Sequence, residues 1–598
     1  MNPDRLLALY ERIADAPDAV ARLRRFILDL AVRGRLVPQD PHDKPAIEHL
    51  RFLSGIPAKT KHLIKPLCDL SVELQLPLAW SWLPLGALIT RMDAGWSPQC
   101  EPHPRTSEED WGVLRTTSVQ ALAFNPAQHK KLPEKLKPRP EYQASIGDIL
   151  VTRAGPKNRV GVSCVVDVVC PRLMISDKLI RFHALGDLSP RFLALALNAG
   201  HTFEQIEAAK SGMAVMQMNI SQSKLRAIPI PLPPIAEQHR IVAKVDELMA
   251  LCDRLEAARA QRESARDRLA AASLARLNAP DLDLATFTDH ARFVLDALPA
   301  LTTRADQIKQ LRQTILNLAV RGKLVPQDLS DEPASELLCR IRSEKTRLLE
   351  AGEISKGKHL KPIASAEQFF EPPSGWVWCR CGELVLTSDS GWSPRTESHA
   401  RQGDAWGVLK VSAVSWDRFD PAANKQVLPG TKPRLQAQVH KGDFLISRAN
   451  TAELIARSVL VLEEPLNLMM SDKIVRLRLT SHCSHRFLWV VNNHADFARA
   501  YYAANATGVS PSMKNVARGV ILDLPIPLPP LAEQHRIVAK VDELMALCDR
   551  LEASLATADS SRRRLLDALL HEALAPAMMD DSIESAEALA RQDLSALA

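Results

Sequence analysis

The sequence predicts an α+β chain in which two similar β-rich modules, each with its own helices, are separated by long helices. The main observation is internal repetition: the 22 residues AEQHRIVAKVDELMALCDRLEA begin at Ala236 and begin again, unchanged, at Ala532. A second segment, LRRFILDLAVRGRLVPQD from Leu23, returns as LRQTILNLAVRGKLVPQD from Leu311. The two periods, 296 and 288 residues, are far longer than the roughly 20–50 residues of a solenoid repeat. Each copy is therefore predicted to be a domain-sized module.

Between the repeated segments the halves share only spaced landmarks and short strand-like runs. GWSP occurs at Gly95 and Gly391, and Ser-Asp-Lys occurs at 176–178 and 471–473. Runs such as GDILVTRA and KLIRF, or GDFLISRA and KIVRLRL, are rich in β-branched and apolar residues, which is typical of strands. The run RFLALALNAGHTFEQIEAA predicts a helix after them. A common fold with different surfaces is the simplest interpretation.

The repeated segment after each β-rich region has helical periodicity. Each copy follows a proline-rich stop, IPIPLPP or LPIPLPP, which favours an extended entry before Ala-Glu-Gln opens a helix. Apolar residues then alternate at steps of four and three, the a and d pattern of a coiled coil. About 40 residues at 1.5 Å each give a rod of roughly 60 Å. The predicted coiled-coil residues are Ile241, Val245, Leu248, Cys252, Leu255, Ile537, Val541, Leu544, Cys548 and Leu551.

Composition excludes several classes of protein. Hydrophobic residues make up 46% and charged residues 24% of the chain, which argues against wholesale disorder. The apolar runs are too short to cross a bilayer, and MNPDRLLALYERIAD is too charged for a signal peptide, so we expect a cytoplasmic protein without a membrane segment. The ten cysteines are scattered, which favours reduced thiols. The net charge of +6 permits nucleic-acid binding without demonstrating it.

Motifs that resemble catalytic chemistry fail on context. The run GEISKGKH from Gly352 is close to a phosphate-binding loop, but it follows a charged helical run rather than a strand and ends in His359. Cys379 and Cys381 lack nearby partners for a metal site. We find no cofactor loop, methyltransferase motif or nucleophile triad, so the sequence predicts a chain with no catalytic residues, no cofactor and no metal of its own.

Polar clusters at strand ends and loops are the candidate DNA-binding residues. Arg and Lys suit guanine edges and phosphates, and Asn and Gln suit adenine edges. Because the clusters differ between modules, each module is predicted to recognise a different sequence; the alternatives for any one residue are a solvated loop residue or a phosphate contact. The candidates are Arg115, Thr116, Thr117, Ser118, Arg153, Lys157, Asn158, Arg159, Gln217 and Asn219 in the first module, and Lys410, Ser412, Arg448, Asn450, Thr451, Ser512, Lys514 and Asn515 in the second.

Two variable modules, each leading through IPIPLPP-x-AEQ or LPIPLPP-x-AEQ into a repeated helix and preceded by AVRGKL-type segments, resemble the specificity subunit of Type I restriction-modification systems. The resemblance implies two target-recognition domains joined by an antiparallel coiled coil of conserved helices. Each domain would recognise half of a bipartite DNA site, and the helices would set the spacer and bind two methyltransferase subunits. Restriction subunits would join through the complex. S-adenosylmethionine, ATP and magnesium would then belong to the partners.

The resemblance also gives domain boundaries, which are expectations. They are 1–76 for an N-terminal helical conserved region, 77–235 for the first target-recognition domain, 236–369 for a central conserved helical region and linker, 370–531 for the second target-recognition domain, 532–576 for a C-terminal conserved helix, and 577–598 for a disordered acidic tail. Two other functions are possible from the sequence: a fused restriction-methyltransferase polypeptide, which would need a cofactor loop, and a protein-binding scaffold without DNA recognition.

Overall fold

The structure is a computed structural model that describes residues 16, 18–52, 76–212, 214–279, 284–355, 357, 359–415, 418–508, 510 and 513–574. The chain divides into two compact units: unit 1 comprises residues 1–262 and 558–598, and unit 2 comprises residues 263–557. Both divisions fall inside long helices, α8 (Ile235–Leu277) and α17 (Leu531–Leu574). The expected acidic tail at 577–598 lies outside the described residues.

Helices and strands are mixed throughout both units, which confirms the predicted α+β class. Besides its parts of α8 and α17, unit 1 contains α2 (Ala19–Val32), α3 (Ala46–Phe52), β1 (Ser81–Pro84), β2 (Ile89–Ala94), β3 (Gly112–Leu114), β4 (Val119–Gln120), β5 (Ala123–Phe124), β6 (His129–Lys131), β7 (Ile149–Thr152), β8 (Ala154–Gly155), β9 (Ser163–Val165), β10 (Leu173–Met174), β11 (Leu179–Ala184), α5 (Pro190–Leu197), α6 (Gly200–Ala209), β12 (Met218–Asn219), α7 (Gln222–Ala227) and β13 (Pro229–Leu232).

Among the described residues, unit 2 has counterparts of the elements of unit 1 except β4 and β5, and it has additional helices. It contains α9 (Leu284–Asp296), α10 (Leu298–Leu301), α11 (Ala305–Val320), α12 (Ala334–Glu350), β14 (Val377–Arg380), α13 (Cys381–Leu384), β15 (Val385–Ser390), β16 (Gly407–Leu409), β17 (Asn424–Gln426), β18 (Phe444–Ser447), β19 (Ala449–Asn450), β20 (Ser458–Leu460), β21 (Leu468–Met469), β22 (Ile474–Leu479), α14 (His485–His494), α15 (Asp496–Asn505), β23 (Lys514–Asn515), α16 (Arg518–Leu522) and β24 (Pro525–Leu528).

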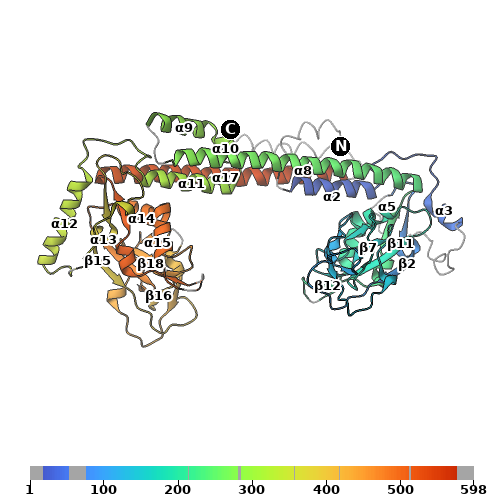
Figure 1. Cartoon of the computed structure of the whole chain (residues 1–598), viewed down its shortest axis with the longest axis horizontal. Helices are drawn as coiled ribbons and strands as arrows, with labels where there is room; N and C mark the ends of the chain where they lie inside the picture. Colours follow the sequence, from blue (N-terminus) through green and yellow to red (C-terminus); the bar gives the residue numbers. More distant parts are fainter. Residues whose placement is uncertain are drawn as a thin grey trace. The chain divides into compact units, whose positions relative to one another are not determined.

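The β-rich part of each unit, called module 1 (residues 77–235) and module 2 (residues 370–531), has the same sheet topology. The main sheet has the order β2-β11-β7-β9 in module 1 and β15-β22-β18-β20 in module 2. Both modules add a three-stranded sheet, β10-β3-β6 or β17-β16-β21, and two strand pairs, β1-β13 with β8-β12 or β14-β24 with β19-β23. Module 1 also has a third pair, β4-β5. The predicted strands within GDILVTRA, KLIRF, GDFLISRA and KIVRLRL are therefore confirmed as β7, β11, β18 and β22. Figure 1 shows β2, β7 and β11 as neighbours in module 1, beneath α5.

The helix predicted over residues 191–209 is in fact two helices, α5 and α6. The side chain of Asn198 ends α5, because its Nδ2 donates to the carbonyl oxygens of Ala194 and Ser163. The backbone N–H of Gly200 then donates to Oδ1 of Asp29 on α2, at 2.8 Å. The helical pattern of the sequence is continuous over this run. Contacts with Ser163 of β9 and Asp29 of α2, both distant in the sequence, therefore divide it into two helices.

A buried arginine braces the main sheet of each module. In module 1 the Arg181 guanidinium lies 2.7 Å from Asp93 and 3.6 Å from the fully buried Asp148. In module 2 Arg476 lies 3.2 Å from both Asp389 and Asp443. Asp148 and Asp443 belong to the repeated Gly-Asp landmark, whose carboxylate also accepts a backbone N–H three residues earlier. Burial raises the pKa of Asp148, while Arg181 opposes that rise.

The long helices carry buried residues near both of their ends. Ile241, Val245 and Cys252 of α8 pack with α2 and module 1, and Ile537 and Val541 of α17 pack with module 2. Leu248 is partly buried in the same cluster as Ile241. In α17, Cys548 is buried against α11, and Leu544 and Leu551 are partly buried there. Leu255 is half-buried and belongs to none of these clusters. The heptad pattern therefore marks apolar positions correctly, while the pairing of α8 with α17 as a coiled coil stays a prediction.

Helices α2 and α11 each contact both long helices within their own unit. In unit 1, Arg24 of α2 pairs with Asp253 of α8, and Arg22 pairs with Asp567 of α17. In unit 2, Arg312 of α11 pairs with Asp549 of α17, and Arg304 at the start of α11 pairs with Asp267 of α8. The two repeated segments of the sequence are therefore the parts that pack together.

The repeated AVRG segment supplies a cap for the end of a long helix. The last carbonyl groups of a helix lack intrahelical partners and favour cationic neighbours. Arg33 and Arg35 donate to the carbonyl oxygen of Leu574, the last residue of α17. Arg321 and Lys323 donate to the carbonyl oxygens of Asn278 and Ala279, just beyond α8.

A buried glutamate joins each module to its long helix. Glu237, in the first turn of α8, accepts hydrogen bonds from the Trp80 indole at 2.9 Å and the Gln39 amide at 2.6 Å. Glu533 of α17 accepts the same bonds from Trp376 at 2.9 Å and Gln327 at 2.7 Å. The glutamine belongs to the repeated VPQD segment and the glutamate to AEQHR. Both repeated motifs therefore meet at one joint, whose residues are the same in the two units.

No described helix is both long enough and apolar enough to cross a lipid bilayer.

We predict that the joint makes stability depend on pH. Burial raises the pKa of Glu237 and of Glu533 above the usual 4.5. The stability that follows from a raised carboxyl pKa is fully present below the unfolded-state pKa and is lost as pH rises through the folded-state pKa. Glu237→Gln should therefore gain stability relative to the unaltered chain as pH rises from about 4 to about 7.

Thermal unfolding across that pH range measures this effect. Glu533→Gln is the matched variant and should show the same trend, whereas Glu237→Ala should be destabilised at every pH because Trp80 and Gln39 lose their acceptor. A pH-independent difference between Glu237→Gln and the unaltered chain would contradict the prediction.

We also predict that Arg181→Ala lowers the free energy of unfolding by about 3–5 kcal/mol, because the buried Asp148 loses the guanidinium beside it and keeps only His183, which is a cation only when protonated. Arg91→Ala is the control, since Arg91 pairs with the same Asp93 from an exposed position and should cost less than about 1 kcal/mol. Urea unfolding followed by tryptophan fluorescence compares the two. Equal effects would show that the Arg181 brace does not stabilise the sheet.

Candidate nucleic-acid interface

Two cations lie side by side where the main sheet of each module ends. Arg153 follows β7, and its backbone N–H donates to the carbonyl oxygen of Lys178, just before β11, at 2.7 Å. In module 2 the backbone N–H of Arg448 donates to the carbonyl oxygen of Lys473 at 2.8 Å. The pairing of antiparallel strands therefore places an arginine and a lysine from distant parts of the sequence at the same sheet end.

The side chains of these cations are uncommitted. Lys178 and Lys473 are exposed, and Arg153 and Arg448 are half-buried. Among the residues that the structure describes, none of the four side chains has a hydrogen-bond or ion-pair partner. Unpaired cations at the same place in both modules are available for an anionic ligand.

A third cation, an arginine stacked on a tryptophan ring, lies close to the same end of the main sheet. In module 1 the Arg139 guanidinium lies 4.4 Å from the ring centre of Trp96, and in module 2 Arg434 lies 4.4 Å from Trp392. Each arginine ends a repeated Lys-Pro-Arg segment, 137–139 or 432–434, whose lysine is exposed. Stacking on the indole holds the guanidinium without neutralising it.

The GWSP and Ser-Asp-Lys landmarks meet at this edge. Ser97 donates its hydroxyl proton to Asp177, and Ser393 does the same to Asp472. A Cβ on Gly95 would lie only 1.9 Å from the carbonyl oxygen of Ile175, so only glycine permits this close approach. The four groups of the edge, namely the stacked tryptophan and arginine, the sheet-end arginine and the Ser-Asp-Lys lysine, are called the basic edge below.

Beside the basic edge lies a nine-residue loop of the same length in both modules, residues 211–219 and 507–515. Its ends pair through two backbone hydrogen bonds, Ser211 with Asn219 at 2.8–2.9 Å and Thr507 with Asn515 at 2.8 Å. Its second residue is glycine with positive φ, +157° at Gly212 and +113° at Gly508. Strand β12 then pairs with β8, immediately after Arg153. We call residues 214–217 and 510–513 the tips of these loops.

The structure brings several sequence-predicted residues together here. Lys157 and Asn158 are exposed next to the loop, since the Lys157 N–H donates to the Val215 carbonyl oxygen at 2.8 Å. Gln217 and Asn219 are exposed on the loop itself. In module 2, Asn450 pairs with Lys514 and Ala449 with Asn515 in the equivalent strands, and Thr451 follows. Ser512 lies outside the described residues.

Several other predicted residues, all of them in module 1, form hydrogen bonds within their module. Ser118 is fully buried and donates to the Arg115 carbonyl oxygen, while Arg159 donates to the carbonyl oxygens of Thr116 and Val119. Arg115 donates to the carbonyl oxygen of Pro102, and the Thr117 hydroxyl donates to the side-chain oxygen of Gln128. In module 2, by contrast, Lys410 and Ser412 are exposed. Ser118 and Arg159 are thus weaker candidates than the exposed cations; contact of any of these residues with DNA stays a prediction.

Sequence reasoning missed three members of the basic edge. Lys178, Trp96 and Arg139, with their module 2 counterparts, were visible only as landmarks or as a short Lys-Pro-Arg repeat. The sequence did contain a signal for these residues, because each is the same amino acid at the corresponding position of the other half. Two modules that bind the same kind of ligand are expected to share the residues that contact it. Their meeting at one edge depends on strand pairing that the sequence does not display.

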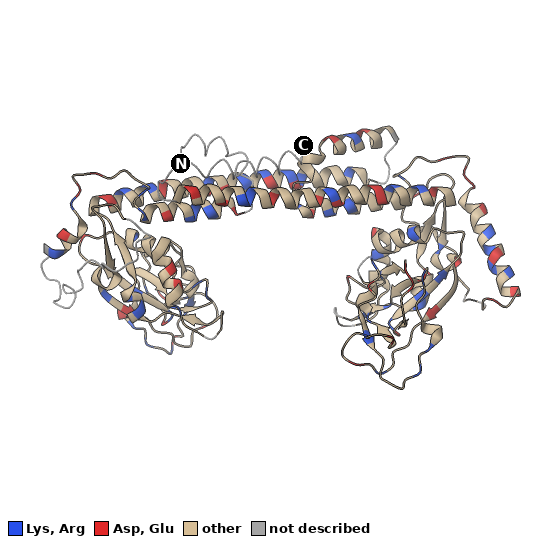
Figure 2. Ribbon diagram, turned by 180° about the vertical axis from the view of Figure 1, so that it is seen from behind, with Lys and Arg blue, Asp and Glu red and all other residues tan. Residues whose placement is uncertain are grey.

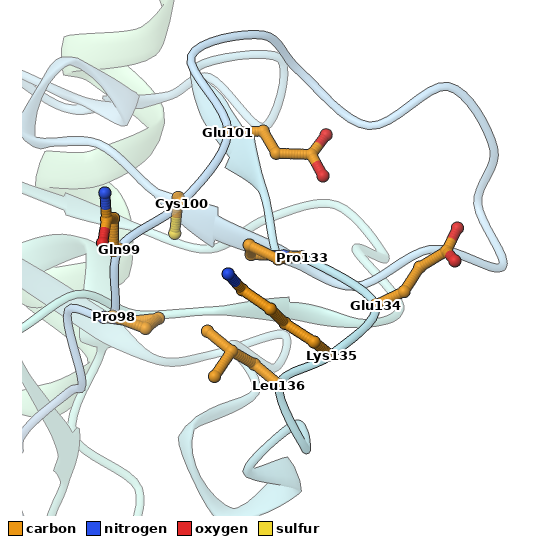
Figure 3. Close-up of a pocket in the computed structure, with 8 residues that line it drawn as sticks. All are labelled: Pro98, Gln99, Cys100, Glu101, Pro133, Glu134, Lys135 and Leu136. Atoms are coloured by element: carbon orange, nitrogen blue, oxygen red, sulfur yellow. The ribbon is translucent and has the colours of Figure 1, made fainter.

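A hollow of about 930 Å³ adjoins the GWSP segment of module 1. Figure 3 shows Cys100 and Lys135 turned toward its middle and the Glu134 carboxylate pointing away. Its lining contains two carboxylates, Glu101 and Glu134, and one lysine, which does not favour an anionic ligand. Burial raises the pKa of the Cys100 thiol, so the thiol form predominates at neutral pH. This lining does not constitute a catalytic set.

The structure also bears on the cysteine pair and the loop-like segment that resemble a metal site and a phosphate-binding loop in the sequence. Within the described parts of the chain, no group of three or more His, Cys, Asp or Glu residues could hold a metal ion. Cys379 and Cys381 are buried free thiols, and burial raises the pKa of Cys381 to about 12. The segment from Gly352 follows the C-terminus of α12 rather than a strand, so it lacks the strand that a phosphate-binding loop requires.

The chain is similar in sequence to a known protein family. Residues 136–262 match the family model described as the Type I restriction modification DNA specificity domain. The chain is 34% identical over 586 residues to the Type I restriction enzyme EcoEI specificity subunit of Escherichia coli, covering 93% of this chain and 94% of that protein. It is 29% identical to the EcoAI specificity subunit of Escherichia coli over 595 residues, with the same coverage.

Among solved structures, the chain resembles one described under complex assembly and conformational transition of the type I R-M system. The TM-score is 0.48 at 18% identity, covering 84% of this chain and 100% of that one. The extent and identity of the match to the EcoEI subunit are decisive: the chain belongs to the family of Type I restriction enzyme specificity subunits.

Proposed function

We propose that this chain is the DNA-recognition subunit of a Type I restriction-modification complex and that each module recognises one half of an asymmetric, bipartite DNA site. The observation that carries the proposal is the basic edge, which has the same residues in both modules, beside a loop of constant frame and different tip. A DNA double helix has a phosphate backbone that is the same at every site and base edges that differ from site to site, which matches a constant edge beside a variable loop.

The basic edge suits the phosphate backbone. Phosphate contacts fix the position of a protein on DNA but carry no sequence information, so the same residues can serve two half-sites. Lys178 and Arg153, with Lys473 and Arg448, have side chains free to neutralise phosphates. The loop tips differ instead, AVMQ in module 1 and SPSM in module 2, as recognition of two different base sequences requires.

The long helices would set the spacer and bind the partners. Helices of 43 and 44 residues are rods of roughly 65 Å, sufficient to separate two DNA-binding modules by more than one helical turn of DNA. Figure 2 shows Lys and Arg intermixed with Asp and Glu along α8 and α17. Such mixed surfaces suit protein partners better than DNA. We propose that these helices pair antiparallel and bind two methyltransferase subunits, and through them restriction subunits, in the cytoplasm.

The reactions would then belong to the partner subunits. S-adenosylmethionine, ATP and magnesium are proposed to bind there, and this chain would contribute recognition without catalysis. A fused restriction-methyltransferase polypeptide would require a cofactor loop after a strand, which the described residues do not supply. A scaffold without DNA recognition would leave the repeated basic edge without a ligand.

We predict that the chain, purified with its methyltransferase partner, selects a bipartite motif from random duplexes. Sequencing of the retained DNA gives both half-sites and the spacer. Replacing residues 95–230 with the same region of another family member should change one half-site and leave the other half-site and the spacer unchanged. Simultaneous change of both half-sites would show that the modules are not independent.

We predict different effects for the basic edge and the tip. Lys178→Ala, and its matched variant Lys473→Ala, should weaken binding equally for specific and unrelated duplexes and lower the salt dependence by about one released counterion each. Gln217→Ala should reduce discrimination at the half-site of module 1 alone. Fluorescence anisotropy over a range of salt concentrations measures both.

Arg191→Ala is the control for lost positive charge, because Arg191 is already paired with Asp246 of α8. Its binding should follow that of the unaltered chain. If Lys178→Ala changed the preferred sequence without changing the salt dependence, the assignment of the basic edge to phosphates would be wrong.

A further inference from the structure

The tip of the loop in module 1 exposes two adjacent large apolar side chains. Val215 is 68% exposed and Met216 is 69% exposed. Adjacent exposed apolar residues in a folded protein often mark a contact with a ligand or partner. At the positions equivalent to Val215 and Met216 the sequence of module 2 has Pro511 and Ser512, so the Val-Met pair belongs to module 1. The next residue of module 2, Met513, is 49% exposed.

The tip is held in place by the fold. The Lys157 N–H donates to the Val215 carbonyl oxygen at 2.8 Å, and the Gln217 N–H closes a turn onto the Ala214 carbonyl oxygen at 2.9 Å. The base of the loop is fixed by the Ser211–Asn219 pair. Because these bonds order the tip before any ligand binds, its side chains are presented without a further ordering cost.

The surroundings of the tip favour a polyanion. The side chains of Arg153, Lys157 and Lys178 are uncommitted among the described residues, and the run from 211 to 220 contains no carboxylate. A ligand that fits must therefore combine negative charge outside with an apolar surface between the charges. Stacked base pairs between phosphates have this property, and DNA-binding proteins insert methionine and other apolar residues between base pairs.

We propose that Val215 and Met216 form an apolar wedge that enters the base stack at one step of the half-site recognised by module 1. This inference rests on the proposed function and adds a physical step to it. The cations hold the flanking phosphates while the wedge partly separates two neighbouring base pairs. The sequence of module 2 lacks the Val-Met pair, so the proposal concerns the half-site recognised by module 1.

The test uses the full chain with its methyltransferase partner and duplexes carrying the motif selected from random DNA. 2-Aminopurine is placed singly at each step of both half-sites, away from the base that is methylated, and S-adenosylmethionine is omitted. Its fluorescence should rise several-fold on binding at one step of the module 1 half-site and at no step of the other.

The variant carrying Val215→Ser and Met216→Ser should abolish that rise and weaken binding to the intact duplex by about tenfold. Its binding to a duplex with an abasic site at the same step should fall by less than about twofold, because the stack there is already open. Val169→Ser is the matched control: Val169 is 77% exposed, and it follows β9 at the opposite end of β7 from Arg153.

Three results would overturn the wedge. Unchanged fluorescence at every step in a bound complex would do so with the unaltered chain alone, independently of any variant. Equal loss of binding to intact and abasic duplexes would do so as well. Loss of methyltransferase binding by the double variant, with the fluorescence rise retained, would identify the tip as a protein contact. Absence of any selected bipartite motif would instead refute the proposed function.

Discussion

The buried carboxylate at the start of each long helix is the contact on which the arrangement of this protein depends. Glu237 and Glu533 lie within the first turn of α8 and α17, each with a tryptophan from the module and a glutamine from the VPQD segment as donors. A buried acceptor must keep its donors, because an unsatisfied buried polar group is costly. Helix, module and VPQD segment are consequently fixed together at one point.

The neighbouring residue strengthens the same joint. Gln238 accepts from the Ser189 N–H, which precedes α5, and donates to the Pro233 carbonyl oxygen. Gln534 repeats both bonds with Ser484 and Pro529. Two adjacent positions of the AEQ motif, the glutamate and the glutamine in the first turn of the helix, thus bind the tryptophan and the residue that precedes α5 or α14. Identity of the motif in the two halves follows from this shared geometry, whereas the surfaces of the modules are free to differ.

The sequence predicted the class of fold and many of its elements because their signals are local. β7, β11, β18 and β22 come from continuous β-branched runs, and the long helices come from apolar residues at steps of three and four. The division between α5 and α6 was not predictable, since it results from Asn198 bonding to Ser163 and from Asp29 of α2 meeting the Gly200 N–H. Likewise the candidate site was found in part: Arg153 and the loop residues were selected, while Lys178 and Arg139 were not.

By itself, the sequence determined that the chain consists of two related modules, where helices and strands occur, and to which family the repeated motifs are similar. Periodicity and repetition are properties of residue order, and residue order is complete in the sequence. Only the tertiary structure decided that Arg153 and Lys178 are neighbours, that Ser118 is buried, and that AVRG segments cap the ends of long helices. These facts depend on which strands and helices pair across large sequence separations, and such pairing is set by packing of the whole unit rather than by any local pattern.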